Sequence, residues 1–276
     1  MEALSSDSRR PLSDASYREF QRLVLLHTGI HLTDNKRSMI VNRFTRRLNA
    51  LNIETFEEYI ELVSKKNNPE TIDFIDTITT NLTYFFREPH HFDFLGKVVL
   101  PKLAAGRSRA EPIRIWSAGC SSGQEPYSIG MTVLDTLDIR KQPVKILCTD
   151  IHSKLVVTTR VGIYGREQLR GLDPETRSKW FKETEDGRWQ ADIAIRQMLY
   201  CKRLNLFGPW PVRSGVDVIM CRNVLIYFND EYQRRLISGF AAMQTPGSYL
   251  FIGHSETLDG FSRLYKRVAN TVYERL

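Results

Sequence analysis

The sequence predicts an α/β fold, in which a largely parallel sheet domain follows an all-α N-terminal domain. Residues 113–118 alternate apolar β-formers and run into a turn bracketed by Gly119 and Gly123, after which Pro126 suits the first turn of a helix. Residues 144–150 form a second apolar run, which ends in Asp150. Strand and helix patterns then alternate to the end of the chain, as in sheets whose parallel strands are joined by helices. We therefore expect a helical domain at 1–90 and a sheet domain at 91–276.

The composition is that of a soluble globular protein of one large or two ordinary domains, with 276 residues, 42% hydrophobic and 26% charged. No apolar run reaches the roughly 18 residues that span a bilayer, and residues 1–10 lack the apolar core of a signal peptide, so we expect a cytoplasmic location. The four cysteines lie far apart, which favours reduced thiols over disulfides or zinc ligands. A net charge of +7 favours an acidic partner of some kind.

Four helices are expected in the N-terminal domain. Ser13 is placed to cap the first, which Gly29 ends, and the second follows Asp34. Thr55 opens a third with the spacing of a capping box, and a fourth begins after Asn68. Residues 79–92 are polar and aromatic without a clean period, and 100–112 are interpreted as the approach to the sheet.

The second helix carries a basic strip along one edge. Lys36, Arg43 and Arg47 fall on this strip, and Arg46 projects beside it. Such a strip is often only the solvated face of a helix, and it is also the surface that an acidic partner would meet.

The second half of the chain continues the sheet with one interruption. A helix follows Asp150 as far as 164, and residues 165–203 are predicted to form an inserted subdomain with a hairpin turn at Asp186-Gly187. Strands are expected at 216–221 and 248–252, a helix at 230–243, and a closing strand pair at 264–268 and 271–275. The closing pair adds an antiparallel strand near one edge of the sheet.

The glycine turn and Asp150 together indicate an adenosine-type cofactor. A helix that begins after a buried strand binds nucleotides in many α/β folds, and an acid at the end of the second strand can accept the two ribose hydroxyls. The glycine turn alone would also be compatible with a tight connection and no ligand.

These motifs together resemble the CheR family of bacterial chemotaxis, the glutamate O-methyltransferases of chemoreceptors, over nearly the whole chain. The resemblance implies a Rossmann-like S-adenosylmethionine-dependent methyltransferase domain with an inserted small β-subdomain, preceded by an all-α receptor-docking domain. The motifs that carry it are Thr80-Asn81-Leu82-Thr83, Phe85-Phe86-Arg87-Glu88, Ser117-Ala118, Gly123-Gln124-Glu125-Pro126-Tyr127-Ser128, Thr149-Asp150-Ile151, Asn205-Leu206, Cys221-Arg222-Asn223, Ile226-Tyr227-Phe228 and Gly253-His254-Ser255-Glu256.

Site residues follow from the resemblance position by position. Arg87 and Tyr227 are expected to position the substrate carboxylate, although Tyr227 alone would be taken for a core aromatic. Asn81 and Thr83 could equally be helix caps. The residues expected around the cofactor are Asn81, Thr83, Arg87, Gly119, Glu125, Asp150, Asn205, Leu206, Arg222 and Asn223.

The implied reaction converts a glutamate side chain into a γ-methyl ester, with S-adenosylhomocysteine as the second product. The implied partner is the cytoplasmic domain of transmembrane chemoreceptors, with docking assigned to Lys36, Arg43, Arg46 and Arg47. A monomer is expected, without a metal, bound nucleic acid or membrane insertion. The hairpin around 182–190 is shorter than in family members that tether to a receptor peptide, which leaves such tethering open.

Four other functions are compatible with parts of the sequence. A nucleic-acid methyltransferase would suit the basic charge, but the chain lacks an Asn/Asp-Pro-Pro-aromatic turn after Cys221. The same fold could methylate another protein or serve as a receptor-binding module without activity, yet no cofactor residue is missing. A nicotinamide dehydrogenase is disfavoured because the turn lacks the full Gly-x-Gly-x-x-Gly.

Overall fold

The computed structural model describes residues 11–108, 111–211 and 214–276. The chain divides into two compact units, Met1–Thr80 and Asn81–Leu276, each of which is described by itself. The division falls ten residues before the expected boundary at 90, because residues 81–90 pack with the sheet. Phe85 is buried there, with its ring 5.2 Å from that of Tyr164.

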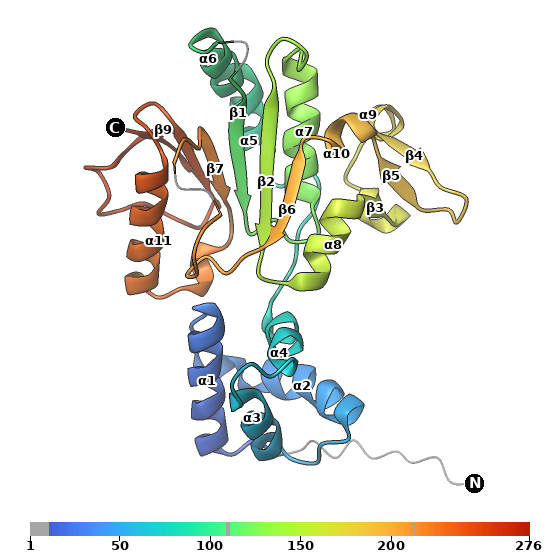
Figure 1. The fold of residues 1–276 in the computed structure, drawn as a ribbon, viewed down its shortest axis with the longest axis vertical. Coiled ribbons are helices and arrows are strands. Elements are labelled where there is room, and N and C mark those ends of the chain that lie inside the picture. Colours follow the sequence, from blue (N-terminus) through green and yellow to red (C-terminus); the bar gives the residue numbers. More distant parts are fainter. Residues whose placement is uncertain (1–10, 109–110, 212–213) are drawn as a thin grey trace. The chain divides into compact units, whose positions relative to one another are not determined.

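The N-terminal unit is all helical, and side-chain hydrogen bonds cap the starts of its first, third and fourth helices, whereas Thr33 makes no capping hydrogen bond before the second. The Ser13 side chain accepts a hydrogen bond from the Ser16 N–H, and Gly29 ends the first helix with a φ of 76°. Thr55 and Asn68 cap the third and fourth helices through Glu58 N and Glu70 N. The helices are α1 (Asp14–Thr28), η1 (Asp34–Lys36), α2 (Arg37–Leu51), α3 (Phe56–Ser64) and α4 (Glu70–Ile78), coloured blue to teal in Figure 1.

An aromatic cluster fills the core of the helical unit. Phe20, Phe44, Tyr59 and Phe74 are fully buried, and each comes from a different helix. The Phe20 and Phe44 rings meet edge to face at 4.7 Å, and the Phe74 ring lies 5.1 Å from Phe20. Aromatic side chains bury a large apolar area each, so these four rings form the centre of the core.

Two of the predicted docking arginines already have partners within the helical unit. Arg43 donates to the carbonyls of residues 77–79 at the C-terminal end of α4. Arg47 forms a two-pronged ion pair with the buried Glu70 and also contacts Asp73 at 2.9 Å. These guanidinium groups hold α4 against α2, because each carries a planar set of donors that matches carbonyl and carboxylate oxygens.

The C-terminal unit is built on a seven-stranded sheet of order β6-β2-β1-β7-β8-β10-β9. Five neighbouring strands are parallel, and β10 runs antiparallel to both β8 and β9, as the sequence predicts. Helices pack on its two faces (Figure 1). The strands are β1 (Ile113–Ala118), β2 (Val144–Asp150), β6 (Leu199–Arg203), β7 (Val218–Cys221), β8 (Tyr249–Ile252), β9 (Tyr265–Ala269) and β10 (Val272–Arg275), and the main helices are α7 (Gln124–Thr136), α8 (Ser153–Val161) and α11 (Asp230–Met243).

The pleat of β1 sends alternate side chains into two separate cores. Ile115 belongs to the core that includes Tyr127 of α7, whereas Trp116 belongs to the core that includes Phe240 of α11.

All four cysteines carry free thiols, as predicted. Within the described residues, no helix combines the length and apolar content needed to cross a bilayer.

A helical segment before β1 is absent from the sequence prediction. It consists of α5 (Pro89–Phe94), a π-helical turn (Leu95–Val99) and α6 (Leu100–Ala105). Gly96 and Pro101 obscure its periodicity, yet Pro101 lies in the first turn of α6, where its missing N–H costs little. Leu95 and Leu100 are fully buried and fix the segment to the sheet.

The insertion forms a small three-stranded sheet of order β3-β5-β4, and its hairpin turn at Asp186-Gly187 is confirmed, with a φ of 74° at Gly187. Its expected end at 203 is wrong, because residues 199–203 are the edge strand β6 of the main sheet, paired with β2. The exposed Lys202 and Arg203 give this strand a loop-like composition. The insertion contains β3 (Ile163–Tyr164), η3 (Arg166–Leu169), α9 (Pro174–Trp180), β4 (Phe181–Glu183), β5 (Trp189–Ala191) and α10 (Ile193–Arg196).

Arg47→Gln should lower the free energy of unfolding of the helical unit by about 2–4 kcal/mol, because it leaves the buried Glu70 carboxylate without its cation. The exposed Arg46→Gln is the matched control and should change stability by less than about 0.5 kcal/mol. Hydrogen exchange of α2 and α4 amides in urea measures the effect. Tryptophan fluorescence follows the C-terminal unit alone, since it holds all four tryptophans. Equal exchange in the two variants would contradict a structural role for Arg47.

Candidate functional site

The turn between β1 and α7 is held open by backbone conformations that few residues adopt. Gly119, Ser121 and Gly123 have φ values of 92°, 50° and 100°. A Cβ on Gly119 would lie 2.6 Å from the Val224 side chain, so only glycine fits there. The N–H groups of Gly119 and Cys120 both donate to the Thr149 carbonyl at 2.8 and 2.9 Å. The turn is thereby fixed against the end of β2.

Asp150 lies at the end of β2, where both of its carboxylate oxygens accept backbone hydrogen bonds. Oδ2 accepts from Ser121 N at 2.8 Å and Oδ1 from His152 N at 2.9 Å. Burial raises the pKa of Asp150, against the lowering effect of these two N–H groups. A carboxylate oxygen can accept two hydrogen bonds, so the Asp150 carboxylate has acceptor capacity for a diol such as a ribose.

Arg222 is the centre of a buried ionic cluster that joins three segments. Its side chain is only 1% exposed and lies 3.1 Å from Glu125 of α7 and 3.4 Å from Glu88 before α5. It also donates to the Arg87 carbonyl, and its guanidinium lies 5.4 Å from the centre of the Phe92 ring. The arginine thereby connects the end of β7 to both the 81–88 loop and the start of α7.

The charges of this cluster do not cancel. Burial alone would raise the pKa of Glu88, but hydrogen bonds from His254 and the charge of Arg222 outweigh it and bring the pKa to about 2. Burial and the Arg222 charge lower the pKa of His91 to about 3, so this histidine is neutral and meets Thr271 at 2.8 Å. With one guanidinium facing two carboxylates, the ionised cluster has a net negative charge.

Glu125 is the member of the cluster that would respond to an added cation. Ser117 donates to its Oε1 at 2.7 Å, and Arg222 contacts its Oε2. Burial raises the pKa of Glu125 in spite of these partners. A cationic ligand beside it would favour the ionised form, so the site fits a positively charged group such as an amine or a sulfonium.

Glu256 braces the segment that follows β7. Its carboxylate accepts from Asn223 N at 3.0 Å and from Ile226 N at 3.3 Å, and also from Gly253 N. Asn223 has a φ of 58°, and a Cβ on Gly253 would lie 2.4 Å from the Asn223 side chain. The brace positions both Asn223 and the short helix η4 (Leu225–Tyr227).

The 81–88 loop contacts the glycine turn through its backbone. The Asn81 carbonyl accepts a hydrogen bond from Ser121 Oγ at 3.3 Å. Ser121 is also the residue whose N–H binds Asp150, so Asn81 lies near this part of the site. Arg87 donates one hydrogen bond to the Leu82 carbonyl at 2.9 Å, and its guanidinium lies 5.9 Å from the Tyr84 ring centre. Thr83 is half-buried in the same loop.

The remaining predicted residues lie on the segments after β6 and β7. Asn205 Oδ1 accepts from Phe207 N at 3.0 Å, and Leu206 is half-buried against the α11-side core. Tyr227 is half-buried at the end of η4. Two groups of residues result from these contacts: one contains Glu125, Arg222, Asn223 and the Arg87 backbone, and the other contains Asp150, Ser121 and Asn81.

Sequence reasoning gave no role to several polar residues of this site, namely Ser117, Glu88, His91, His254 and Glu256. All except His91 lie in the motifs that carry the family resemblance, but the sequence does not reveal which side chains they contact. Potential ligand atoms of Glu88, His90 and His91 lie within 4.8 Å of one another, but Arg222 already supplies the positive charge that Glu88 meets.

Comparison with known proteins matches both units. The model of the CheR methyltransferase all-alpha domain matches residues 15–79, and that of the CheR methyltransferase SAM binding domain matches residues 81–273.

Several chemotaxis protein methyltransferases are similar to this chain over most of their length. The chemotaxis protein methyltransferase of Escherichia coli is 37% identical over 98% of this chain and 94% of its own. That of Borreliella burgdorferi is 39% identical over 88% of each chain, and a probable chemotaxis protein methyltransferase of Rhizobium etli is 37% identical over 91% of this chain and 96% of its own. The chain therefore belongs to the CheR methyltransferase family and is an S-adenosylmethionine-dependent methyltransferase.

Proposed function

We propose that this protein methylates glutamate side chains on the cytoplasmic domain of chemoreceptors, giving γ-glutamyl methyl esters and S-adenosylhomocysteine during sensory adaptation. The observation that supports it most is the net negative charge of the buried Arg222, Glu88 and Glu125 cluster beside the glycine turn, since it suits a cationic cofactor. The relatives are named chemotaxis protein methyltransferases, which supports a receptor as the substrate.

The residues around the turn would hold the cofactor from three sides. Asp150 would accept the ribose hydroxyls on its carboxylate oxygens, and Glu125 would face the cationic amino group. Asn205 and Leu206 would offer an amide and an apolar wall to the adenine, while Asn81, Thr83, Gly119, Arg222 and Asn223 complete the proposed set. S-adenosylmethionine, when bound, supplies a methyl group that is already activated on a sulfonium.

The chain's own task is then to orient the substrate carboxylate and keep water away from it. A glutamate with an ordinary pKa of about 4.3 is ionised at neutral pH, so no general base is required. Arg87 uses one guanidinium N–H on the Leu82 carbonyl and has others to offer a carboxylate. Tyr227, on the segment that Glu256 braces, is proposed as the second positioning group.

Receptor docking is proposed for the helical unit, with a narrower set of residues than the sequence suggested. Arg43 and Arg47 serve α4, whereas Lys36 and Arg46 are exposed and form no ion pair with the residues that the structure describes. An acidic receptor segment would therefore meet Lys36 and Arg46 first.

Transfer of labelled methyl from S-adenosylmethionine into base-labile ester on receptor fragments tests the proposed function directly. Within this assay, Arg87→Ala and Tyr227→Phe should lower kcat by about tenfold to a hundredfold with cofactor Kd little changed, because both are assigned to the carboxylate. Calorimetry gives the Kd for the cofactor. If that Kd rises as steeply as kcat falls, the two residues bind cofactor or support the fold instead.

Cofactor affinity should rise with pH over a window that ends at the raised pKa of Glu125 in the free protein, and then level off. A cation beside Glu125 lowers its pKa on binding, so binding releases protons in this window and is favoured as pH increases. Calorimetry in buffers of different ionisation enthalpy counts the released protons. Glu125→Gln should flatten the profile; an unchanged slope would assign the proton release to another group, with Asp150 the first to examine.

Replacing Lys36 and Arg46 together by Gln should raise the KM for receptor about threefold to tenfold at low salt, since each exposed charge contributes at most about 1 kcal/mol. The effect should fade as ionic strength increases, and the Kd for the cofactor should stay constant. Arg263→Gln with Lys266→Gln removes two exposed charges from the other unit and serves as the control. A KM equal to that of the control at every salt concentration would show that Lys36 and Arg46 are only solvated surface residues and do not take part in receptor docking.

A further inference from the structure

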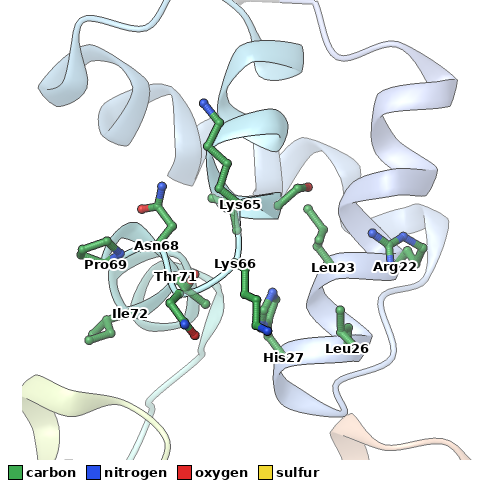
Figure 2. A pocket seen from close by; sticks show the side chains of 13 residues that line it. Arg22, Leu23, Leu26, His27, Lys65, Lys66, Asn68, Pro69, Thr71 and Ile72 are labelled. Atoms are coloured by element: carbon green, nitrogen blue, oxygen red, sulfur yellow. The ribbon is translucent and has the colours of Figure 1, made fainter.

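A groove of about 530 Å³ lies entirely within the helical unit, apart from every residue assigned above (Figure 2). One wall is the C-terminal half of α1, with Leu23, Leu26 and His27. The other is the loop from α3 to α4 and the first turn of α4, with Pro69 and Ile72. The volume is in the range of sites that bind ligands or peptide side chains.

The groove collects the exposed apolar surface of its unit. Leu26 is 65% exposed and Ile72 is 42% exposed, and they are the only exposed large apolar side chains among the described residues 11–80. Both line this one groove. The core of the unit does not use them, because the buried positions of α1 are Tyr17, Phe20, Leu23 and their neighbours. Paired apolar exposure on facing walls is typical of a surface that a partner covers.

The rim of the groove is basic and contains no acidic residue. Arg22, Lys65 and Lys66 lie along it. Arg22 is paired with Glu19 at 2.7 Å and Lys65 only loosely with Glu61 at 3.9 Å, both pairs being solvent-exposed, while Lys66 has no carboxylate within ion-pair distance in the described chain. The charge of the rim therefore complements carboxylates that flank an apolar stripe.

We propose that this groove binds an amphipathic helix of a protein partner, with two apolar side chains about one turn apart packing on Leu26 and Ile72 and acidic residues facing Lys65 and Lys66. An α-helix presents apolar side chains at i and i+4 in this way, and grooves between helices commonly receive one. A small polar ligand fits less well. The buried side-chain atoms without hydrogen-bond partners in the described residues all lie outside the groove, so it has no buried polar group waiting to orient such a ligand.

The test uses the full chain and a fluorescein-labelled peptide of about 20 residues, long enough to be helical alone, with two leucines at i and i+4 in an Ala and Glu background. Fluorescence anisotropy gives the Kd. Leu26→Ser with Ile72→Ser should raise it by about tenfold to a hundredfold, the effect of losing one well-packed apolar contact or more. Lys65→Glu with Lys66→Glu should also raise it, most strongly at low salt.

Two matched controls distinguish binding in the groove from nonspecific binding to exposed side chains. Val157→Ser removes an apolar side chain that is 53% exposed on α8, and Lys266→Glu reverses an exposed charge on β9, so neither should change the Kd. A peptide with serine in place of both leucines should not bind. Leu26→Ala repeats the apolar test with a strong helix former, and circular dichroism confirms that each variant is folded.

Several results would overturn the proposal. The peptide could fail to bind, or bind the Leu26→Ser and Ile72→Ser variant as tightly as the parent, or respond to charge alone. Leu26-dependent binding to phosphatidylglycerol vesicles without peptide binding would assign the groove to a membrane surface. Methyl transfer is measured in a separate assay. A negative result for peptide binding therefore does not affect the proposed function, and a negative result for methyl transfer does not affect the proposed groove.

Discussion

The site depends on one buried guanidinium. Arg222 reaches Glu125 on α7, Glu88 before α5 and the Arg87 carbonyl, so it connects three segments that are far apart in the sequence. Removing water from these groups is costly unless each finds a partner, and a single arginine can meet all of them because its donors spread in a plane. When both carboxylates are ionised, the excess negative charge suits the cationic cofactor that we propose binds here.

The contacts that surround the site also explain where the backbone is strained. All the described non-glycine residues with positive φ in the C-terminal unit, Phe86, Glu88, Ser121, Asn223 and Thr271, lie in this site or contact it. Such conformations cost on the order of 1 kcal/mol or more each and persist where surrounding contacts fix them. The Glu256 brace and the Arg222 cluster provide those contacts. A site arranged in this way is formed before any ligand arrives, which reduces the ordering that binding requires.

Much of the fold could be predicted because its signals are local. Ser13, Gly29 and the Asp186-Gly187 turn each act within a few residues, and the predictions made from them are confirmed. The helical segment 89–105 and the edge strand β6 were missed because Gly96, Pro101 and exposed charges weaken periodicity where tertiary packing decides the structure. The groups that hydrogen-bond to the Glu88 carboxylate, and the arginine that pairs with it, come from residues more than 130 positions away, and no pattern in one sequence reports such pairs.

Charge illustrates the limit most clearly. From the sequence, Arg43, Arg46 and Arg47 are equivalent members of one basic strip. In the structure, the guanidinium groups of Arg43 and Arg47 are bound by acceptors within the same unit. The C-terminal carbonyls of α4 and the buried Glu70 satisfy two of these arginines, so a count of basic residues overstates what the helical unit offers to a partner. What counts for recognition is the set of exposed cations without an ion-pair partner in the described chain, and in this unit Lys36, Arg46 and Lys66 belong to it. Lys66 stands beside exposed apolar side chains and Lys36 and Arg46 do not share its groove, so the unit has chemically distinct surfaces for partners.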